Sequence, residues 1–290
     1  MIKDFERFAP KTLKEALALL DKYQDDCKVI AGGQSLLVLM KQGLVAPKYL
    51  VDIKGLSELS YIKDEKGGLK IGALTTHRTI EKSPVIKKKY PVLAEMETRL
   101  ASIQTRNWGT IAGNLCHADP AGDPAPVLIA LNATLSTASV RGKRNMAVED
   151  FTLDYFETAL EPGELLTEIQ IPAVPPHTGT AYTKFNIIES DLATVGVAVS
   201  VTLGSGDGIC QNARIALGAA APTPMRAKQA EAVLKGKKIT DSLLQEAGEI
   251  ASSEAEPISD IQASENYRRE LVKVLIKRMG KEALARAKQS

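Results

Sequence analysis

Residues 12–42 alternate helical, extended and glycine-rich segments, and this order constrains the fold more than any other feature of the sequence. Thr12-Leu-Lys-Glu15 is a capping box, and apolar residues follow it at helical spacing. The β-prone run Cys27–Ile30 then leads through the turn Ala31–Ser35 into a helix-like segment, Leu36–Gln42. The order helix, strand, glycine turn, helix predicts an α/β layer.

A larger group of elements follows. Tyr49–Ile53 and, after a glycine turn, Leu69–Ile71 are extended runs. A helix is predicted from Pro91 through Ile103, ending before Arg106, because proline is tolerated in a first helical turn and apolar residues recur at helical spacing. The Gly-, Pro- and Asp-rich stretch His117–Pro126 has apolar neighbours, which is typical of a functional loop rather than of disorder.

A proline-rich connector, Ala173–Gly179, marks a domain boundary. Beyond it, Thr194–Leu203 and Ala213–Leu217 alternate like strands around Gly204–Gly208, which predicts an antiparallel hairpin. Three helical segments complete the chain: Met225–Leu234, Ile239–Ser252 and Tyr267–Lys288. We therefore expect a first domain over residues 1–175 and a C-terminal α+β domain over residues 176–290.

Composition and charge exclude several classes of protein. Apolar residues make up 44% of the 290 residues and charged residues 25%, as in ordinary globular proteins. A net charge of +2 provides little attraction for a phosphate backbone, so nucleic acid is not expected as a partner. The N-terminus has no signal-peptide pattern, and the longest apolar runs are far shorter than the roughly 18 residues that suggest a membrane span. We expect no membrane span and a cytoplasmic protein.

The cysteines exclude a metal centre within this chain. Cys27, Cys116 and Cys210 lie far apart, without a CxxC motif or a Cys/His cluster, so neither zinc nor an iron–sulfur cluster has local ligands. No Ser/His/Asp or Cys/His triad is indicated by spacing, and HExxH is absent, which argues against hydrolysis. Any metal of the system would belong to another chain.

Two glycine-bearing turns are the main functional signal: Ala31-Gly-Gly-Gln-Ser35 and Thr110-Ile-Ala-Gly-Asn114. Glycine allows positive φ and close backbone approach, so successive N–H groups can converge on a diphosphate. Each turn alone is a weak signal. Neither the strand before the first turn nor the one before the second is followed by the G-x-G-x-x-G pattern of a Rossmann fold or by the lysine of a P-loop. The pair therefore indicates a nucleotide held by backbone groups and neutral side chains.

Other polar and aromatic residues are weaker candidates. Asp119 and Asp123 are equally compatible with a ligand role and with loop aspartates that bond their own backbone. A structural role is favoured for His77. Trp108 is interpreted as a packing residue beside the second turn. Lys184 alternates with apolar neighbours in a strand, which predicts a solvated side chain.

Several segments resemble one known family, in the same order and spacing along nearly the whole chain. They are Ala31-Gly-Gly-Gln-Ser35, Arg106-Asn-Trp-Gly-Thr-Ile-Ala-Gly-Asn114, Asp123-Pro-Ala-Pro126, Glu164-Leu-Leu-Thr-Glu-Ile-Gln-Ile-Pro172 and Tyr267-Arg-Arg. They are similar to the FAD-binding medium subunit of the molybdenum hydroxylases, relatives of xanthine dehydrogenase and aerobic carbon monoxide dehydrogenase. The resemblance implies an α+β fold. A two-lobed FAD-binding domain of the vanillyl-alcohol-oxidase (PCMH) type, with lobes over about 1–55 and 56–175, would precede a C-terminal antiparallel sheet and three-helix domain of the carbon monoxide dehydrogenase flavoprotein type.

The resemblance also implies which residues hold FAD. Two segments would wrap the diphosphate from opposite sides: Val29, Ile30, Ala31, Gly32, Gly33, Gln34, Ser35 and Leu36, and Thr110, Ile111, Ala112, Gly113 and Asn114. Ala101, on the helix before the second turn, would lie along the cofactor. Asp123 would hydrogen-bond the ribityl or diphosphate region, and Leu165 would pack near the isoalloxazine ring. Lys184 would lie near the flavin, which replaces the prediction from spacing alone that it is solvated. The family usually has glycine at the position of Ala112, so this alanine requires a negative φ.

The implied function is electron transfer within an oxidoreductase for xanthine, an aldehyde, carbon monoxide or an N-heterocycle. A large partner would oxidise substrate at a molybdenum cofactor, a small partner would relay electrons through two [2Fe–2S] clusters, and FAD in this chain would collect them. A dimer of heterotrimers is expected, with NAD, quinone, ferredoxin or oxygen as the acceptor. The hydroxybenzoyl-CoA branch is excluded, because scattered cysteines cannot supply its [4Fe–4S] cluster. A free-standing FAD-dependent oxidoreductase and a scaffold subunit without flavin remain alternatives.

Overall fold

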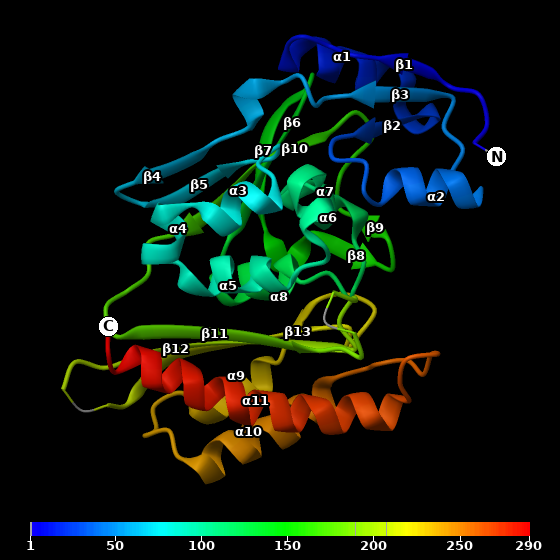
Figure 1. Cartoon of the computed structure of the whole chain (residues 1–290). Coiled ribbons are helices and arrows are strands. Elements are labelled where there is room, and N and C mark those ends of the chain that lie inside the picture. Colours follow the sequence, from blue (N-terminus) through cyan, green and yellow to red (C-terminus); the bar gives the residue numbers. More distant parts are fainter. Residues whose placement is uncertain (1, 189, 207) are drawn as a thin grey trace.

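The computed structural model of the chain describes residues 2–188, 190–206 and 208–290. Its elements stack in layers from the N-terminal lobe to the C-terminal helices (Figure 1). A small lobe comes first, a five-stranded sheet with a group of short helices forms the middle, and a second sheet covered by long helices closes the other end. Among the described residues, no helix combines the length and the apolar character needed to cross a membrane.

The N-terminal lobe is a small parallel sheet with a helix packed on it. The strand order is β1–β3–β2, and the lobe contains β1 (Glu6–Phe8), α1 (Leu13–Tyr23), β2 (Cys27–Ile30), α2 (Leu36–Gln42) and β3 (Tyr49–Asp52). Thr12 caps α1, because its hydroxyl accepts a hydrogen bond from the backbone N–H of Glu15. Leu17 and Leu20 of α1 are buried with Val51 of β3 in one cluster. The predicted α/β layer is confirmed.

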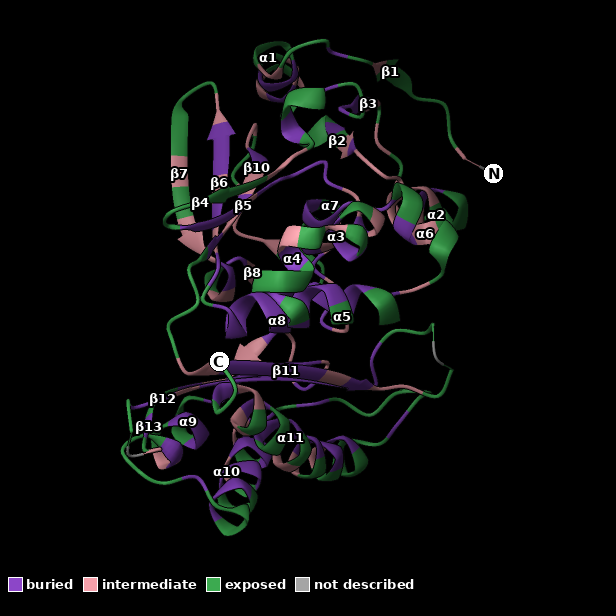
Figure 2. Cartoon of the chain, turned by 60° about the vertical axis from the view of Figure 1, so that its left-hand side comes forward, coloured by how far each residue is buried: buried purple, intermediate pink, exposed green. Residues whose placement is uncertain are grey.

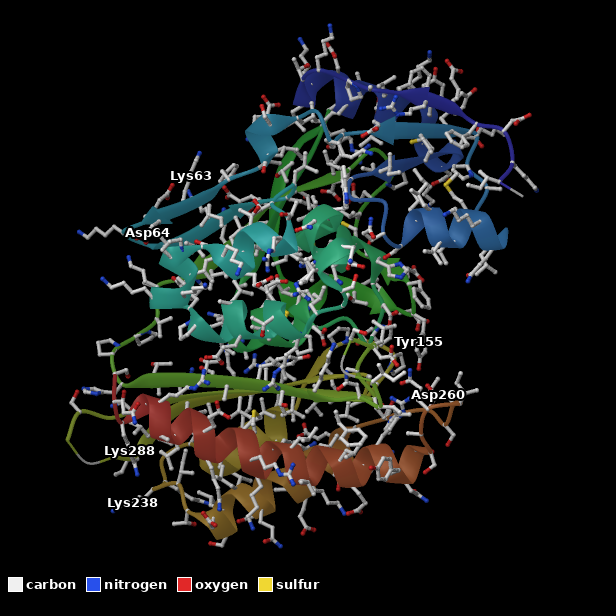
Figure 3. The ribbon with its side chains drawn as sticks, in the orientation of Figure 1. Lys63, Asp64, Tyr155, Lys238, Asp260 and Lys288 are labelled. Carbon is white, nitrogen blue, oxygen red and sulfur yellow. The ribbon has the colours of Figure 1, made fainter. Side chains whose placement is uncertain are left out.

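The middle layer pairs an antiparallel sheet with a run of short helices. The sheet order is β4–β5–β10–β6–β7, with β4 (Ile62–Glu65), β5 (Gly68–Gly72), β6 (Thr134–Ser139), β7 (Gly142–Ala147) and β10 (Leu165–Pro172). The helices are α3 (His77–Lys82), α4 (Pro84–Lys89), α5 (Pro91–Arg99), α6 (Ile103–Trp108), α7 (Ile111–His117) and α8 (Pro124–Ala130). A small hairpin follows β7, formed by β8 (Thr152–Asp154) and β9 (Glu157–Thr158). Figure 3 shows Lys63 and Asp64 of β4 at the outer edge of this layer.

One predicted helix of this layer is wrong. The sequence predicts a continuous helix from Pro91 that ends before Arg106. The structure instead has α5 and α6, separated by residues 100–102, and α6 continues to Trp108. Ala101 has a φ of 43°, in the left-handed region, so the helix cannot pass through it. Ser102 then caps α6 by accepting a hydrogen bond from the backbone N–H of Thr105. Because Leu100 is still buried, the apolar spacing continues through the break and conceals it.

The C-terminal layer is a four-stranded antiparallel sheet covered by helices. The order is β11–β12–β13–β14, with β11 (Thr178–Phe185), β12 (Val195–Leu203), β13 (Cys210–Gly218) and β14 (Met225–Arg226). The helices are α9 (Lys228–Leu234), α10 (Asp241–Glu254) and α11 (Glu265–Ala287), close to the three predicted segments. β12 and β13 pair with Val199 opposite Ile215, so the predicted hairpin is confirmed, although residue 207 of its turn lies outside the described residues.

Both faces of the C-terminal sheet are covered. On one face, Val197 and Val199 share a hydrophobic cluster with α10 and α11. On the other face, Tyr182, Ala198 and Ala216 belong to the cluster that contains α5, α8 and the strands of the middle sheet. α8 contacts β12 and β13, and α5 contacts β11. Figure 2 shows many buried residues in α8 and in β11. The middle layer and the C-terminal sheet therefore share one continuous core.

Gly179→Ala is expected to lower the free energy of unfolding by about 3 kcal/mol, the upper end of the usual cost of overpacking. An added Cβ would lie 2.1 Å from the carbonyl oxygen of Ala283 and 2.4 Å from the backbone nitrogen of Ala287, and backbone atoms of α11 cannot rotate away. Urea unfolding followed by circular dichroism measures the loss. Gly67→Ala is the matched control, because nothing lies within 4 Å of its added methyl group. Equal stability of the two variants would contradict this prediction.

Candidate functional site

The turn between β2 and α2 presents a row of unpaired backbone N–H groups. Within the described residues, the N–H groups of Gly32, Gly33, Gln34 and Ser35 donate no hydrogen bond to the protein. Gly33 has a φ of 72°, and a left-handed residue of this kind lets successive N–H groups point to one side. The Gln34 side-chain amide donates to the carbonyl oxygen of Gly32 at 3.1 Å and fixes the turn. Converging free donors of this kind fit a diphosphate.

The first turn lies directly against Trp108 and Gly109, which immediately precede the second glycine-bearing segment. A Cβ added to Gly32 would lie 2.2 Å from the carbonyl oxygen of Trp108 and 2.7 Å from the Cα of Gly109. Cγ of Gln34 lies 3.6 Å from the position that a Cβ on Gly109 would take. The N-terminal lobe and the middle layer thus meet here backbone to backbone. Residue 32 has to be glycine for the two segments to approach this closely.

The second segment begins a helix and does not form a turn. Thr110 caps α7, because its hydroxyl accepts a hydrogen bond from the backbone N–H of Gly113 at 3.1 Å. Thr110 also forms a β-bridge with Thr76, which fixes the start of α7 against the preceding loop. Ala112 is buried in α7 and is not among the residues with positive φ, so it meets the condition that its methyl group imposes. The predicted turn is therefore wrong in backbone form, although Trp108 and Gly109, just before it, lie against the first turn.

The loop after α7 gives its two aspartates different surroundings. Oδ1 of Asp119 accepts a hydrogen bond from the backbone N–H of Ala121 at 2.9 Å, which is the structural interpretation of a loop aspartate. Asp123 is buried and faces β11. Its Oδ1 accepts a hydrogen bond from the hydroxyl of Tyr182 at 2.6 Å, and its Oδ2 accepts one from the ammonium group of Lys184 at 2.7 Å. Asp123 therefore joins the middle layer to the C-terminal sheet.

Lys184 is buried, so the solvated side chain predicted from strand alternation is wrong. Its side chain is 2% exposed, and its ammonium group also donates to the carbonyl oxygen of Asp191 at 2.8 Å. Burial raises the pKa of Asp123, and the adjacent Lys184 ammonium opposes that rise. Alternation misleads here because helices cover both faces of β11, α5 on one face and α11 on the other.

Further buried charges lie behind these segments, between α3, α5 and α6. Nδ1 of His77 lies 2.9 Å from Oε2 of Glu97, and both side chains are buried. Nε of Arg106 donates to Oε2 of Glu81 at 3.0 Å, and this pair is also buried. Burial raises the pKa of Glu97. These contacts support the structural role expected for His77.

The remaining predicted residues surround the first turn or the break before α6. Ala101 is partly buried between α5 and α6 and is not on a helix, as noted above. Leu165 opens β10, is 5% exposed and belongs to the cluster under α1. Val29 and Ala31 pack against this same cluster.

Sequence reasoning missed Tyr182 and the surroundings of Arg106, and it misinterpreted Trp108. Trp108 is 63% exposed, so it is not a packing residue, and its backbone lies against Gly32. Tyr182 and Lys184 are two residues apart in β11 and so lie on the same face, which was a usable signal for a shared partner. No spacing rule connects Arg106 with the backbone that it contacts.

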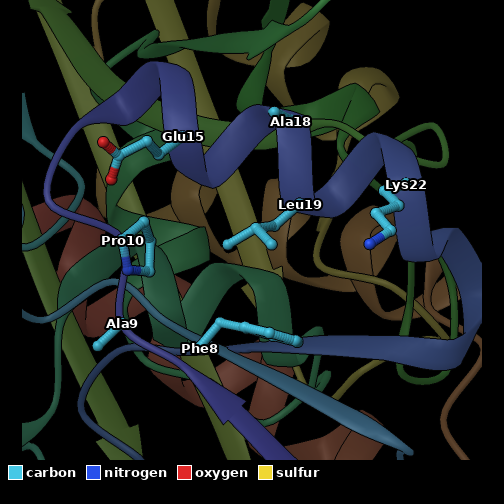
Figure 4. Close-up of a pocket in the computed structure, with 7 residues that line it drawn as sticks. All are labelled: Phe8, Ala9, Pro10, Glu15, Ala18, Leu19 and Lys22. Atoms are coloured by element: carbon cyan, nitrogen blue, oxygen red, sulfur yellow. The ribbon is translucent and has the colours of Figure 1, made fainter.

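A shallow groove of about 410 Å³ lies elsewhere, between α1 and the chain at β1 (Figure 4). It is lined by Phe8, Ala9, Pro10, Glu15, Ala18, Leu19 and Lys22. None of the predicted FAD residues lines it. Among the described residues, no group of three or more His, Cys, Asp or Glu side chains is placed to hold a metal ion.

Both parts of the chain match models of known protein families. Residues 3–174 match the FAD binding domain in molybdopterin dehydrogenase, and residues 180–283 match the CO dehydrogenase flavoprotein C-terminal domain. The chain therefore belongs to the FAD-binding medium subunits of the molybdenum hydroxylase family. It is a flavoprotein subunit of a molybdenum hydroxylase-type oxidoreductase, and its α+β fold is that of the medium chain of carbon monoxide dehydrogenase.

Individual relatives cover almost the whole chain. The glyceraldehyde dehydrogenase medium chain of Sulfolobus acidocaldarius is 36% identical over 96% of this chain and 98% of its own length. The carbon monoxide dehydrogenase medium chain of Hydrogenophaga pseudoflava is 36% identical over 97% of this chain and 98% of its own. A solved structure of carbon monoxide dehydrogenase from the same organism superposes with a TM-score of 0.96 at 37% identity, covering 99% of both chains. Quinoline 2-oxidoreductase from Pseudomonas putida 86 gives 0.92 at 35% identity, again over 99% of both.

Proposed function

We propose that this chain binds FAD between the first turn and the start of α7 and passes electrons from [2Fe–2S] clusters of a partner subunit through FAD to an external acceptor. The observation that carries the proposal is the row of unpaired N–H groups at Gly32–Ser35, placed against Trp108–Gly109. Donors without acceptors in the protein suit the oxygens of a diphosphate. When bound, FAD accepts single electrons and releases them singly or as a hydride.

In this proposal each part of the site has its own task. The segments 29–36 and 110–114 hold the diphosphate through backbone N–H groups and neutral side chains. Leu165 packs near the isoalloxazine ring, and Ala101 lies along the cofactor. Asp123 and Lys184 neutralise each other, so they orient the ribityl and ring region without adding net charge. The FAD-binding domain spans residues 1–175, with lobes over about 1–55 and 56–175, and the C-terminal domain spans 176–290.

The relatives support a proposal about partners, because they are medium chains of dehydrogenases. We infer a complex with a large molybdenum-cofactor subunit and a small iron–sulfur subunit, assembled as a dimer of heterotrimers in the cytoplasm. NAD, quinone, ferredoxin and oxygen are all compatible acceptors, because the proposed site residues bind FAD and none of them is assigned to the acceptor. The substrate pocket belongs to the large subunit.

A visible absorbance spectrum of the purified chain tests the proposal, with mass identification of any compound released by denaturation. We expect a flavin spectrum and release of FAD, and copurification from native cells with one larger and one smaller chain. A folded chain that releases no FAD and takes up none when it is added would favour the scaffold alternative. Oxidation of an organic substrate by the purified chain alone would favour a free-standing oxidoreductase.

A further inference from the structure

We propose that Arg106, anchored by Glu81, is a positioning residue that holds Ala101 in its left-handed conformation beside bound FAD. This inference rests on the proposed function, because it takes Ala101 to lie along the cofactor. Neither Arg106 nor Glu81 is among the residues expected to contact FAD. Their effect would pass through the backbone of residues 100–101.

Arg106 binds the backbone at the break between α5 and α6. Its Nη1 donates to the carbonyl oxygen of Leu100 at 2.6 Å and to that of Ala101 at 2.7 Å. The same guanidinium donates through Nε to Oε2 of Glu81 at 3.0 Å. Arg106 is 7% exposed and Glu81 is 6% exposed, so water does not compete strongly for these hydrogen bonds.

Glu81 is itself fixed in place. Its Oε1 accepts a hydrogen bond from Nη1 of Arg78 at 2.5 Å, while its Oε2 is used by Arg106. Burial raises the pKa of Glu81, but the hydrogen bonds from Arg78 and Arg106 outweigh this effect and leave the pKa below its usual value. The carboxylate therefore stays ionised at neutral pH and orients the guanidinium plane of Arg106.

The conformation of Ala101 needs such support. Its φ of 43° brings the Cβ of an L-residue close to the following carbonyl group, a strain that glycine does not have. Ala101 adopts this strained conformation although it lacks the conformational freedom of glycine. Nη1 of Arg106 donates hydrogen bonds to the carbonyl oxygens before and after the Cα of Ala101, and these two bonds fix the direction of the backbone there.

Arg106 also lies on α6, and the end of this helix contacts the first turn. α6 starts just after Ala101 and ends at Trp108, whose carbonyl oxygen abuts Gly32 in the first turn. On the opposite side of the break, Nη1 of Arg99 donates to the hydroxyl of Thr183, the neighbour of Lys184. Ala101 is thus fixed between the first turn and β11. A shift of residue 101 would alter the space between them.

Lysine cannot replace arginine in this arrangement. Arg106 uses Nε and Nη1 in a planar fork to reach an acid and two carbonyl oxygens, whereas a lysine ammonium is a single point on a flexible chain. Arg106→Lys keeps the charge beside Glu81 and removes the fork. It therefore separates the positioning role from simple charge balance.

The test is a double-mutant cycle on the full-length chain, with Arg106→Lys, Ala101→Gly and the double variant, each stripped of flavin and titrated with FAD. We expect Arg106→Lys to weaken FAD binding about tenfold, which corresponds to the loss of one charge-assisted hydrogen bond. In the Ala101→Gly background the same change should weaken binding about threefold or less, because glycine adopts the left-handed conformation unaided. Glu81→Gln should act in the same direction as Arg106→Lys and should also be relieved by Ala101→Gly.

Arg226→Lys is the matched control, because Arg226 in β14 is another largely buried arginine with two acidic partners, Glu231 of α9 and Glu149, which follows β7. It should leave the FAD dissociation constant unchanged. Equal losses from Arg106→Lys in the Ala101 and Ala101→Gly backgrounds would overturn the inference and leave Arg106 as a charge partner only. Unchanged FAD binding in Arg106→Lys and Glu81→Gln would overturn it as well. If the unmodified chain binds no FAD, the proposed function and this inference both fail, whereas a loss confined to the variants spares the proposed function.

Discussion

Gly32→Ala is expected to weaken FAD binding by about a hundredfold, which corresponds to the upper range of overpacking costs. The added methyl group would overlap the carbonyl oxygen of Trp108 at 2.2 Å and the Cα of Gly109 at 2.7 Å. These are backbone atoms, so no side-chain rotation relieves the overlap. The first turn would have to move away from α6, and its N–H groups would no longer face the start of α7. Titration of the flavin-free chain with FAD, followed by flavin fluorescence, measures the effect.

Gly55→Ala is the matched control for this prediction. An added methyl group at Gly55 meets nothing within 4 Å, and its φ is not positive, so the substitution brings neither overlap nor strain. It should bind FAD as the unmodified chain does. If Gly32→Ala bound FAD with unchanged affinity, the contact between the two segments would not be part of the site.

Lys184→Met is expected to lower the free energy of unfolding by about 3 kcal/mol and to reduce the FAD content of the purified chain. The substitution removes the ammonium group that lies 2.7 Å from Oδ2 of Asp123 and leaves that carboxyl group buried with Tyr182 as its partner. Burial already raises the pKa of Asp123, and loss of the cation would raise it further. Urea unfolding at neutral pH measures stability, and the visible spectrum measures FAD content.

The control for this pair is an exposed ion pair of the same type. Lys281 and Asp241 have side chains that are 49% and 68% exposed, so Lys281→Met should change the free energy of unfolding by less than about 1 kcal/mol. The double variant Asp123→Asn with Lys184→Met should recover part of the stability lost in Lys184→Met, because no unpaired charge remains buried. A Lys184→Met variant as stable as Lys281→Met would refute a stabilising role for the buried pair.

Local patterns predicted the elements whose formation depends on their own residues. The capping box at Thr12 and the alternating strands around Gly204–Gly208 were readable because caps and hairpins are short-range structures. The break at Ala101 was not readable, because nothing in its residue type favours a left-handed conformation. That conformation accompanies contacts with Arg106, whose effect on residue 101 is tertiary and invisible to spacing rules.

The candidate site shows the same division. The two glycine-bearing segments were found from sequence because close backbone approach requires glycine, and Gly32 does contact Trp108 and Gly109, which lead into the second segment. The strand pattern predicted that Lys184 is solvated. Only the family resemblance predicted that it lies near the flavin. Strand alternation separates two faces without saying which of them is covered, and β11 is covered on both.

The shared core of the middle layer and the C-terminal sheet has a consequence for folding. Tyr182, Ala198 and Ala216 contribute to the same hydrophobic interior as α5 and α8, so neither part can open without exposing apolar surface of the other. The middle layer and the C-terminal sheet should therefore melt as one cooperative unit, and the C-terminal half of the chain should not behave as a detachable module. Any partner that stabilises the C-terminal sheet would then stabilise the α5–α8 region as well, through mass action on a single folding equilibrium.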